Sequence, residues 1–225
     1  MGGEISRLTG DARDTIDTID ALREVLDKLD GLLRNLDPPS LYLDFEGVKS
    51  GKNSRISILQ LHILPTRETF LIDVLLLGAR AFSTPSSLGY TFEDILESEM
   101  IPKIIFDVRN FSAALFNYFQ IRIRGVLDLQ LMEAATRHPK GANFNELSRC
   151  IELDLALPQS EIAAWKKTEK KGLDLFNPKY GGNYEVLDER PLSEEIKLYC
   201  VQKVQFLLNC GRNTTRRSLR SGGIG

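Results

Sequence analysis

Side chains that build covalent or metal-bound structure are scarce in this chain of 225 residues. It has three cysteines, Cys150, Cys200 and Cys210, without CxxC spacing, and two histidines, His62 and His138. This spacing excludes a disulfide framework and a zinc site of the usual pattern, so we expect reduced thiols in an intracellular protein, cytoplasmic or nuclear. Neither histidine lies in a motif with a nucleophile or a carboxylate, which argues against nucleophilic catalysis with a histidine base.

Long apolar runs and an excess of one charge are also absent. No apolar segment approaches the roughly 20 residues of a membrane span, and the N-terminus lacks the order of a secretion signal, so we expect no membrane partner. The formal net charge is −2, so any surface for nucleic acid must come from local clusters of basic residues. The sequence has no P-loop, which excludes that class of nucleotide-binding site.

The composition that remains is that of an ordinary globular domain, with 42 % apolar and 27 % charged residues. The length suits a single α/β domain with extensions. We expect a flexible N-terminus over residues 1–17, one domain over residues 18–210, and a disordered basic tail over residues 211–225. The tail is rich in Arg, Ser, Thr and Gly and has few residues that could form a core.

The order of elements along the chain indicates the fold. Apolar residues at three- and four-residue spacing predict a helix over residues 20–33. Residues 40–46, 56–64 and 69–74 are typical of strands, and their short connections predict an antiparallel meander. Further strands are expected at residues 103–106 and 125–127. A capping box at residues 91–94 predicts the start of a short helix. Five more helices are expected, at residues 110–119, 130–136, 143–151, 160–170 and 193–208. This order predicts an α/β, ribonuclease-H-like mixed sheet, with an antiparallel meander plus parallel strands, flanked by helices.

Asp44 and Glu46 carry the most informative chemistry. They lie two positions apart in an expected strand, so both face the side opposite Leu43 and Phe45. Neighbouring carboxylates repel each other, and their oxygens are the ligands that Mg²⁺ and Mn²⁺ prefer. The triplet alone is more often the solvated outer face of an edge strand, so the choice depends on the rest of the chain.

Four stretches in order resemble the DEDD 3'–5' exonucleases of the RNase D, Werner and Egalitarian branch. They are residues 41–47 followed by 56–61, residues 103–110, residues 126–130 and residues 199–204. The resemblance implies a family in which four acidic residues hold two divalent ions for phosphodiester hydrolysis. In such enzymes a tyrosine four residues before the last aspartate orients the water. The resemblance therefore implies that Asp44 and Glu46 are catalytic and metal-binding residues, and that Tyr199 is the tyrosine.

Two positions depart from the family pattern. Phe111 stands where the second motif has an aspartate, and Lys203 stands where the third motif has one. An ammonium at that place repels metal ions, and we expect it to pair directly with Asp44 or Glu46. The plainer interpretations are a solvated lysine at Lys203 and an apolar helix stripe at Phe111.

Two other carboxylates were candidates for a relocated ligand. Asp107 follows an expected strand, so a shifted register would let it reach one metal ion. Asp128 lies in a stretch that the family also keeps, where we expect a structural or capping role. Retained activity with such altered ligands would require Mg²⁺ or Mn²⁺, whereas a protein without activity would need no cofactor.

Basic residues supply the candidate nucleic-acid contacts. Arg109 and Asn110 follow the second-motif strand, and a lysine cluster in an expected helix has the spacing to follow phosphates. The candidate contacts in this cluster are Lys166, Lys167 and Lys170. A solvated, charge-balanced helix face is the plainer interpretation of the lysines. Trp165 beside them is suited to stacking on a base, although tryptophan among apolar residues more often packs internally.

The sequence thus leaves three functions open. The favoured one is a degenerate domain that binds single-stranded RNA or DNA, RNA more than DNA, with little or no cleavage. The second is a metal-dependent 3'–5' exonuclease with altered ligands. The third is a scaffold for a protein partner or for a second copy of the chain. Whether the protein is an enzyme stays open, with loss of activity favoured by Phe111 and Lys203.

Overall fold

A computed structural model describes residues 15–33, 41–48, 55–64, 66–137, 143–154 and 158–221. Within this part of the chain, one sheet has the strand order β3-β2-β1-β4-β5. The strands are β1 (Leu41–Glu46), β2 (Ile58–Ile63), β3 (Glu68–Asp73), β4 (Lys103–Ile105) and β5 (Val126–Asp128). The pairs β1–β2 and β2–β3 are antiparallel, whereas β1–β4 and β4–β5 are parallel. The expected mixed sheet, a meander followed by parallel strands, is confirmed.

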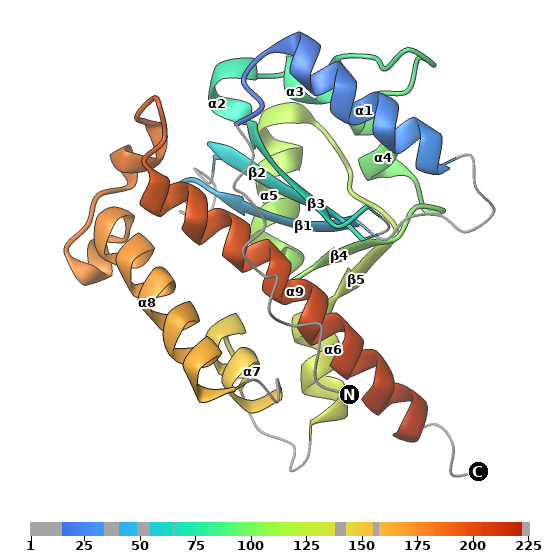
Figure 1. Ribbon diagram of the computed structural model, residues 1–225. Coiled ribbons are helices and arrows are strands. Elements are labelled where there is room, and N and C mark those ends of the chain that lie inside the picture. The colour runs from blue at the N-terminus through green and yellow to red at the C-terminus, as the bar shows by residue number, and fades with distance from the viewer. Residues whose placement is uncertain are drawn as a thin grey trace.

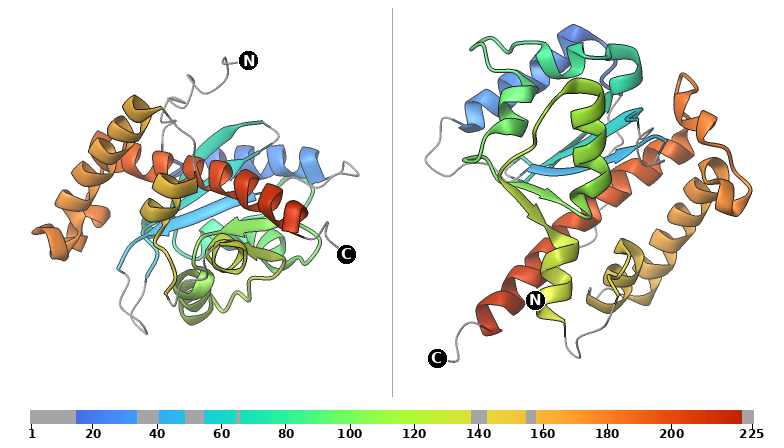
Figure 2. Two further views of the ribbon diagram at one scale, coloured as in Figure 1. Left: turned by 90° about the horizontal axis from the view of Figure 1, so that it is seen from below. Right: turned by 180° about the vertical axis from the view of Figure 1, so that it is seen from behind.

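Helices cover both faces of the sheet (Figure 1). One face carries α1 (Ile19–Leu33), α2 (Val74–Leu77), α3 (Arg80–Ser83), α4 (Phe92–Glu97) and α5 (Val108–Phe119). The other face is crossed by the long helix α9 (Glu194–Ser221), with α6 (Leu129–Thr136), α7 (Leu147–Asp154) and α8 (Gln159–Phe176) beside it. Two 3₁₀ turns, η2 (Pro178–Tyr180) and η3 (Tyr184–Asp188), join α8 to α9. Figure 2 shows the same layers from below and from behind.

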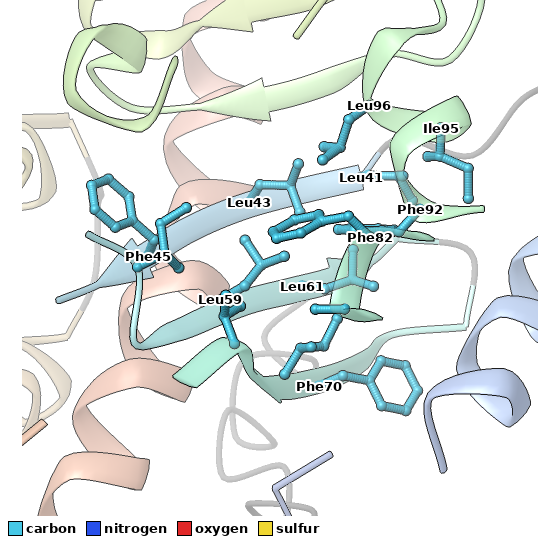
Figure 3. Packing of buried hydrophobic residues seen from close by; sticks show 14 of the residues in the cluster. Leu41, Leu43, Phe45, Leu59, Leu61, Phe70, Phe82, Phe92, Ile95 and Leu96 are labelled. Atoms are coloured by element: carbon cyan, nitrogen blue, oxygen red, sulfur yellow. The ribbon is translucent and has the colours of Figure 1, made fainter. Parts of the chain in front are cut away.

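Strand β1 is buried on both sides because of these two layers. Its odd-numbered side chains Leu41, Leu43 and Phe45 enter the core beneath α1 to α5, as Figure 3 shows from close by. Its residue Tyr42 belongs instead to the cluster formed with α6 to α9. Successive side chains of β1 thus enter two different hydrophobic layers, one on each face of the sheet. Any polar side chain on the α9 side of β1 is therefore removed from bulk water.

Local signals explain several helix boundaries. Thr91 caps α4 by accepting from the backbone amide of Asp94, and the Asp94 carboxylate accepts from the amide of Thr91, so the expected capping box is confirmed. Helix α9 begins after Ser193, whose hydroxyl accepts from the amide of Ile196 at 3.3 Å. The short helices α2 and α3 were not expected, because four-residue helices carry too little periodicity to be recognised.

The two ends of the chain differ from the expectation in part. Helix α9 continues to Ser221, where a disordered tail was expected from residue 211 onward. That segment contains no proline but has residues of low helix propensity, such as Gly211, Asn213 and Thr214. Its helix therefore depends on the nucleated helix that precedes it. Near the N-terminus, Ile16 forms a parallel bridge with Ile72 of β3, so residues 15–17 are held by the open edge of the sheet. Residues 1–14 and 222–225 lie outside the described residues, and the proposed domain limits stay predictions.

The turn before α9 is anchored to the sheet by two ion pairs. Arg190 donates to both carboxylate oxygens of Asp73 at the end of β3, and Asp73 is fully buried. Asp188 in η3 accepts from Arg55 and from the hydroxyl of Ser57, the latter at 2.7 Å. These contacts fix where α9 starts, and therefore which of its side chains lie over β1.

Candidate functional site

Asp44 and Glu46 lie at the carboxyl end of β1, on the face that α9 covers. Asp44 is 9 % exposed and Glu46 is fully buried. The interpretation of this pair as a solvated outer face is therefore wrong, because the sheet face that carries it packs against α9. Two buried carboxylates this close together require a compensating positive charge.

Lys203 of α9 supplies that charge. Its Nζ lies 2.8 Å from Asp44 Oδ2 and 2.7 Å from Glu46 Oε1. Burial by itself would lower the pKa of Lys203, but the charges of Asp44 and Glu46 outweigh it and raise the pKa well above its usual range. The expected direct salt bridge is present, and it involves both carboxylates. The interpretation of Lys203 as a solvated lysine is wrong, because its ammonium is paired and only 21 % of its side chain is exposed.

Tyr199 lies one turn before Lys203 on the same face of α9. It is 6 % exposed and packs against Phe176 at 5.2 Å between ring centroids. A Cβ added to Gly172 of α8 would lie 2.6 Å from the Tyr199 ring, so only glycine permits this close approach of the two helices. Burial and the Glu46 carboxylate raise the pKa of Tyr199 well above its usual range. Tyr199 is therefore a buried, neutral side chain beside the ion pair.

Phe111 lies on the other side of the sheet. It is 1 % exposed and stacks on Phe45, with ring centroids 5.3 Å apart and planes inclined by 19°. Because Phe45 points away from the face of Asp44 and Glu46, the Phe111 ring belongs to the core beneath α5. The interpretation of Phe111 as part of an apolar helix stripe therefore holds.

The two candidate relocated carboxylates are engaged elsewhere. Asp128 accepts hydrogen bonds from the backbone amides of Asp107 and Val108, at 3.1 and 3.0 Å. It also caps α6 by accepting from Gln130 at 2.9 Å, so its expected structural role is confirmed. Asp107 forms two hydrogen bonds with Arg109, at 2.5 and 2.9 Å. Neither carboxylate takes part in the ion pair of Lys203.

Two residues near the ion pair were missed at the sequence level. Gln60 is the cross-strand partner of Asp44 and is fully buried, and its amide has no hydrogen-bond partner in the described part of the chain. Glu169 of α8 is half-buried; burial raises its pKa to about 7, against the opposing influence of Lys203. It lies between Trp165 and Gly172, which both face α9. Gln60 could have been identified from the sequence, because it is a polar residue within an otherwise apolar strand. Glu169 could be identified only once the packing of α8 on α9 was known.

The donor set does not fit the metal site that the family resemblance implies. An ion held by both Asp44 and Glu46 would have to take the position of the Lys203 ammonium, and Phe111 offers no oxygen. Among the residues that the structure describes, no group of three or more His, Cys, Asp or Glu side chains is arranged to hold a metal ion. The cation at this site is part of the protein.

The expected nucleic-acid contacts lie on two separate surfaces. Arg109 and Asn110 are exposed at the start of α5. On α8, the side chains of Lys166 and Lys170 pair with Glu152 and Asp174. Lys167 is exposed, about 200° around the helix from Trp165 and hence on the side away from α9. Lys166 and Lys170 are thus engaged in ion pairs with carboxylates, and the role of the lysine cluster stays a prediction.

Trp165 is not available as a stacking surface. It is 4 % exposed and packs against Phe206 of α9 at 5.7 Å between ring centroids. Its carbonyl accepts a hydrogen bond from Gln202 at 3.0 Å. The alternative of internal packing is confirmed. In the described part of the chain, none of the helices is long and apolar enough to cross a membrane.

Known proteins are similar to this chain in sequence or in fold. The family model described as 3'-5' exonuclease matches residues 14–212. The Egalitarian protein homolog of Caenorhabditis elegans is 25 % identical over 181 residues, which are 79 % of this chain and 29 % of that protein. The chain thus spans less than a third of the length of that relative.

Two solved structures share the fold. The RNase D complex with RNA U12 from Trypanosoma brucei has a TM-score of 0.63 at 22 % identity, covering 87 % of this chain and 60 % of that one. The Nibbler EXO domain of Aedes aegypti has a TM-score of 0.59 at 15 % identity, covering 92 % and 88 %. With the family model matching most of its length, this chain belongs to the 3'–5' exonuclease domain family and has its ribonuclease-H-like fold.

Proposed function

We propose that this protein is a degenerate 3'–5' exonuclease-like domain that binds single-stranded nucleic acid, RNA more than DNA, with little or no cleavage. The observation that carries the proposal is the pair of short contacts from Lys203 to Asp44 and Glu46. A lysine ammonium in this position offsets one of the two negative charges and fills the place between the carboxylates where a metal ion would bind. Support for nucleic acid as the ligand comes from membership of the family and from the RNase D of similar fold that was solved with RNA U12.

Divalent ions are, on this proposal, unnecessary for binding. A metal-dependent nuclease holds its substrate partly through ions that bridge carboxylates and phosphate. Here Lys203 already fills the place between the two carboxylates, so no bridging metal ion takes part. Binding is therefore expected to persist in EDTA and to weaken with added salt, as phosphate contacts do. An intracellular location belongs to the same proposal and is supported by the burial of Cys150 and Cys200.

The test is a paired assay of binding and cleavage on 5'-labelled single-stranded RNA and DNA, with Mg²⁺, Mn²⁺ or EDTA. The parent protein is compared with Lys203→Asp, which restores an acidic side chain, and with Lys203→Gln, which only removes the charge. Phe111 is left unchanged because an aspartate there would be buried in the core. The expected result is binding by the parent in EDTA without shortening of either strand.

Each other result has a clear meaning. Metal-dependent shortening by the parent that Asp44→Asn abolishes would show an active exonuclease with altered ligands. Shortening by Lys203→Asp alone, and not by Lys203→Gln, would support a disarmed exonuclease. Absence of both binding and cleavage in the parent would contradict the proposal and leave a scaffold for a protein partner or a homodimer.

A further inference from the structure

The guanidinium of Arg109 lies over an exposed aromatic ring at the start of α5. Its Cζ is 5.8 Å from the centroid of Phe144, whose exposed fraction is 52 %. The guanidinium is held from two other directions, by the carboxylate of Asp107 and by Gln130 Oε1 at 3.3 Å. Arg109 is therefore positioned by its neighbours, although 66 % of its side chain is exposed.

The loop that carries Phe144 is fixed as well. Gln130 Nε2 donates to the carbonyl of Asn145 at 3.0 Å, and the side chain of Asn145 donates to Glu133 Oε1 at 3.0 Å. A ring that is half exposed on an anchored loop has little conformational freedom left to lose when something packs on it. Phe144 and Arg109 together present an exposed, largely preorganised surface to solvent.

This surface lies at the end of the sheet that carries the ion pair. Strands β1, β4 and β5 are parallel, so their carboxyl ends share one edge, and open α/β sheets bind ligands at this edge. Arg109 is two residues before Phe111, whose ring stacks on Phe45 of β1 on the face of the sheet opposite Asp44 and Glu46. The start of α5 is therefore adjacent to the functional end of β1.

We propose that Phe144 and Arg109 form a stacking platform for an unpaired base of a single-stranded nucleic acid. The inference rests on the proposed function and adds the surface and the mode of contact. Every base has a flat π face, so an aromatic ring and a guanidinium plane accept a base with little regard to sequence. The platform selects single strands, because a paired base is stacked within its duplex.

The charge of this surface favours base contact over phosphate contact. Asp107 accepts two hydrogen bonds from Arg109, and these bonds raise the pKa of Arg109 above its ordinary value. The pair carries no net charge, so Arg109 contributes a planar surface more than a free positive charge. Loss of Phe144 should therefore weaken binding without changing its salt dependence.

The chain contains a matched control at the other end of α5. Arg122 Cζ lies 5.5 Å from the centroid of Phe116, which is 40 % exposed. This pair has the same chemistry, but it lies at the carboxyl end of α5, with Phe116 in the last turns of the helix and Arg122 just after it. The variants to compare are Phe144→Leu and Arg109→Gln with Phe116→Leu and Arg122→Gln.

The experiment is a fluorescence anisotropy titration in EDTA with a short labelled oligoadenylate RNA and with an abasic strand of equal length. Thermal unfolding checks that each variant is folded. Phe144→Leu is expected to weaken oligoadenylate binding by about tenfold, the size of one lost base stack, and Arg109→Gln by severalfold. The Phe116 and Arg122 variants should bind like the parent, and the abasic strand should not distinguish Phe144→Leu from the parent.

The failures of the two proposals are distinguishable. If the parent binds RNA and Phe144→Leu binds equally well, the platform is excluded while the proposed function stands. Equal losses in the Phe144 and Phe116 variants would exclude it too. If Arg109→Gln reduces the slope of log affinity against log salt by about one, Arg109 contacts a phosphate and the stacking role is wrong. A parent that binds no single strand would overturn both.

Discussion

Lys203 bridges two carboxylates of β1: its Nζ is 2.8 Å from Asp44 Oδ2 and 2.7 Å from Glu46 Oε1. The family resemblance places the two acidic residues in the first motif and the lysine at the aspartate position of the third. A cation from the protein's own chain thus lies between the two carboxylates that the family resemblance assigns to a metal site.

Removing the ammonium is expected to destabilise the fold. Lys203→Met leaves Asp44 and Glu46 buried without their counter-charge, which typically costs about 3–5 kcal/mol. Urea unfolding at neutral pH measures the loss. Lys170→Met is the control, since its side chain is 75 % exposed and its loss should stay within about 0.5 kcal/mol. Recovery of stability on adding Asp44→Asn and Glu46→Gln would confirm the cause, and a Lys203→Met protein as stable as the parent would contradict it.

Divalent metal should stabilise one variant and not the parent. Lys203→Asp places a third carboxylate beside Asp44 and Glu46, so its melting temperature in EDTA should fall below that of the parent. Mn²⁺ should restore part of the loss, because a ligand that binds only the folded state stabilises it. Lys203→Gln is the control and should not respond. A clear rise in the melting temperature of the parent with Mn²⁺ would show that the native site accepts metal.

Restoring the second-motif aspartate should disrupt the core. Phe111→Asp removes a ring that is stacked on Phe45 and introduces a carboxylate at a position that is 1 % exposed. Loss of a buried phenylalanine costs about 3–5 kcal/mol before the charge is counted. Phe116→Asp on the same helix is the control, because that ring is partly exposed. Comparable melting temperatures for the two variants would show that α5 can turn Phe111 out of the core.

Glu169 should make stability fall as the pH rises. Burial raises its pKa from an ordinary 4.5 to about 7, so the folded state binds its proton more tightly than the unfolded state does. The stabilisation is complete below about pH 4.5 and disappears as the pH rises through about 7. Urea unfolding across this range should show a shallower decline for Glu169→Gln than for the parent. Parallel curves would mean that Glu169 is not protonated in this window.

His62 should act in the opposite direction over nearly the same range. Burial lowers its pKa from 6.5 to about 4, and its Nδ1 lies 2.9 Å from the hydroxyl of Thr69. The neutral ring contributes stability above about pH 6.5, and this is lost as the pH falls toward about 4. His62→Gln should flatten that loss. If acid unfolding of the variant follows the parent, other groups control it.

Much of the fold could be predicted from local patterns. The alternation at residues 41–46 and the short connections after it predicted a meander with Asp44 and Glu46 on one face. Element boundaries were less accurate, as for α8, which extends to Phe176 where a helix of residues 160–170 was expected. Propensities and turn residues specify the type of an element better than its last turn.

The sequence by itself determined that Asp44 and Glu46 share a face, that α9 places Tyr199 and Lys203 one turn apart, and that Phe111 is apolar. Only the tertiary structure decided which face of β1 is covered, that one ammonium contacts both carboxylates, and that Phe111 stacks on the opposite side. The physical reason is range: strand alternation and helical periodicity act over a few residues. The contact from Lys203 to Glu46 joins positions 157 residues apart, and it depends on how α9 packs across the sheet.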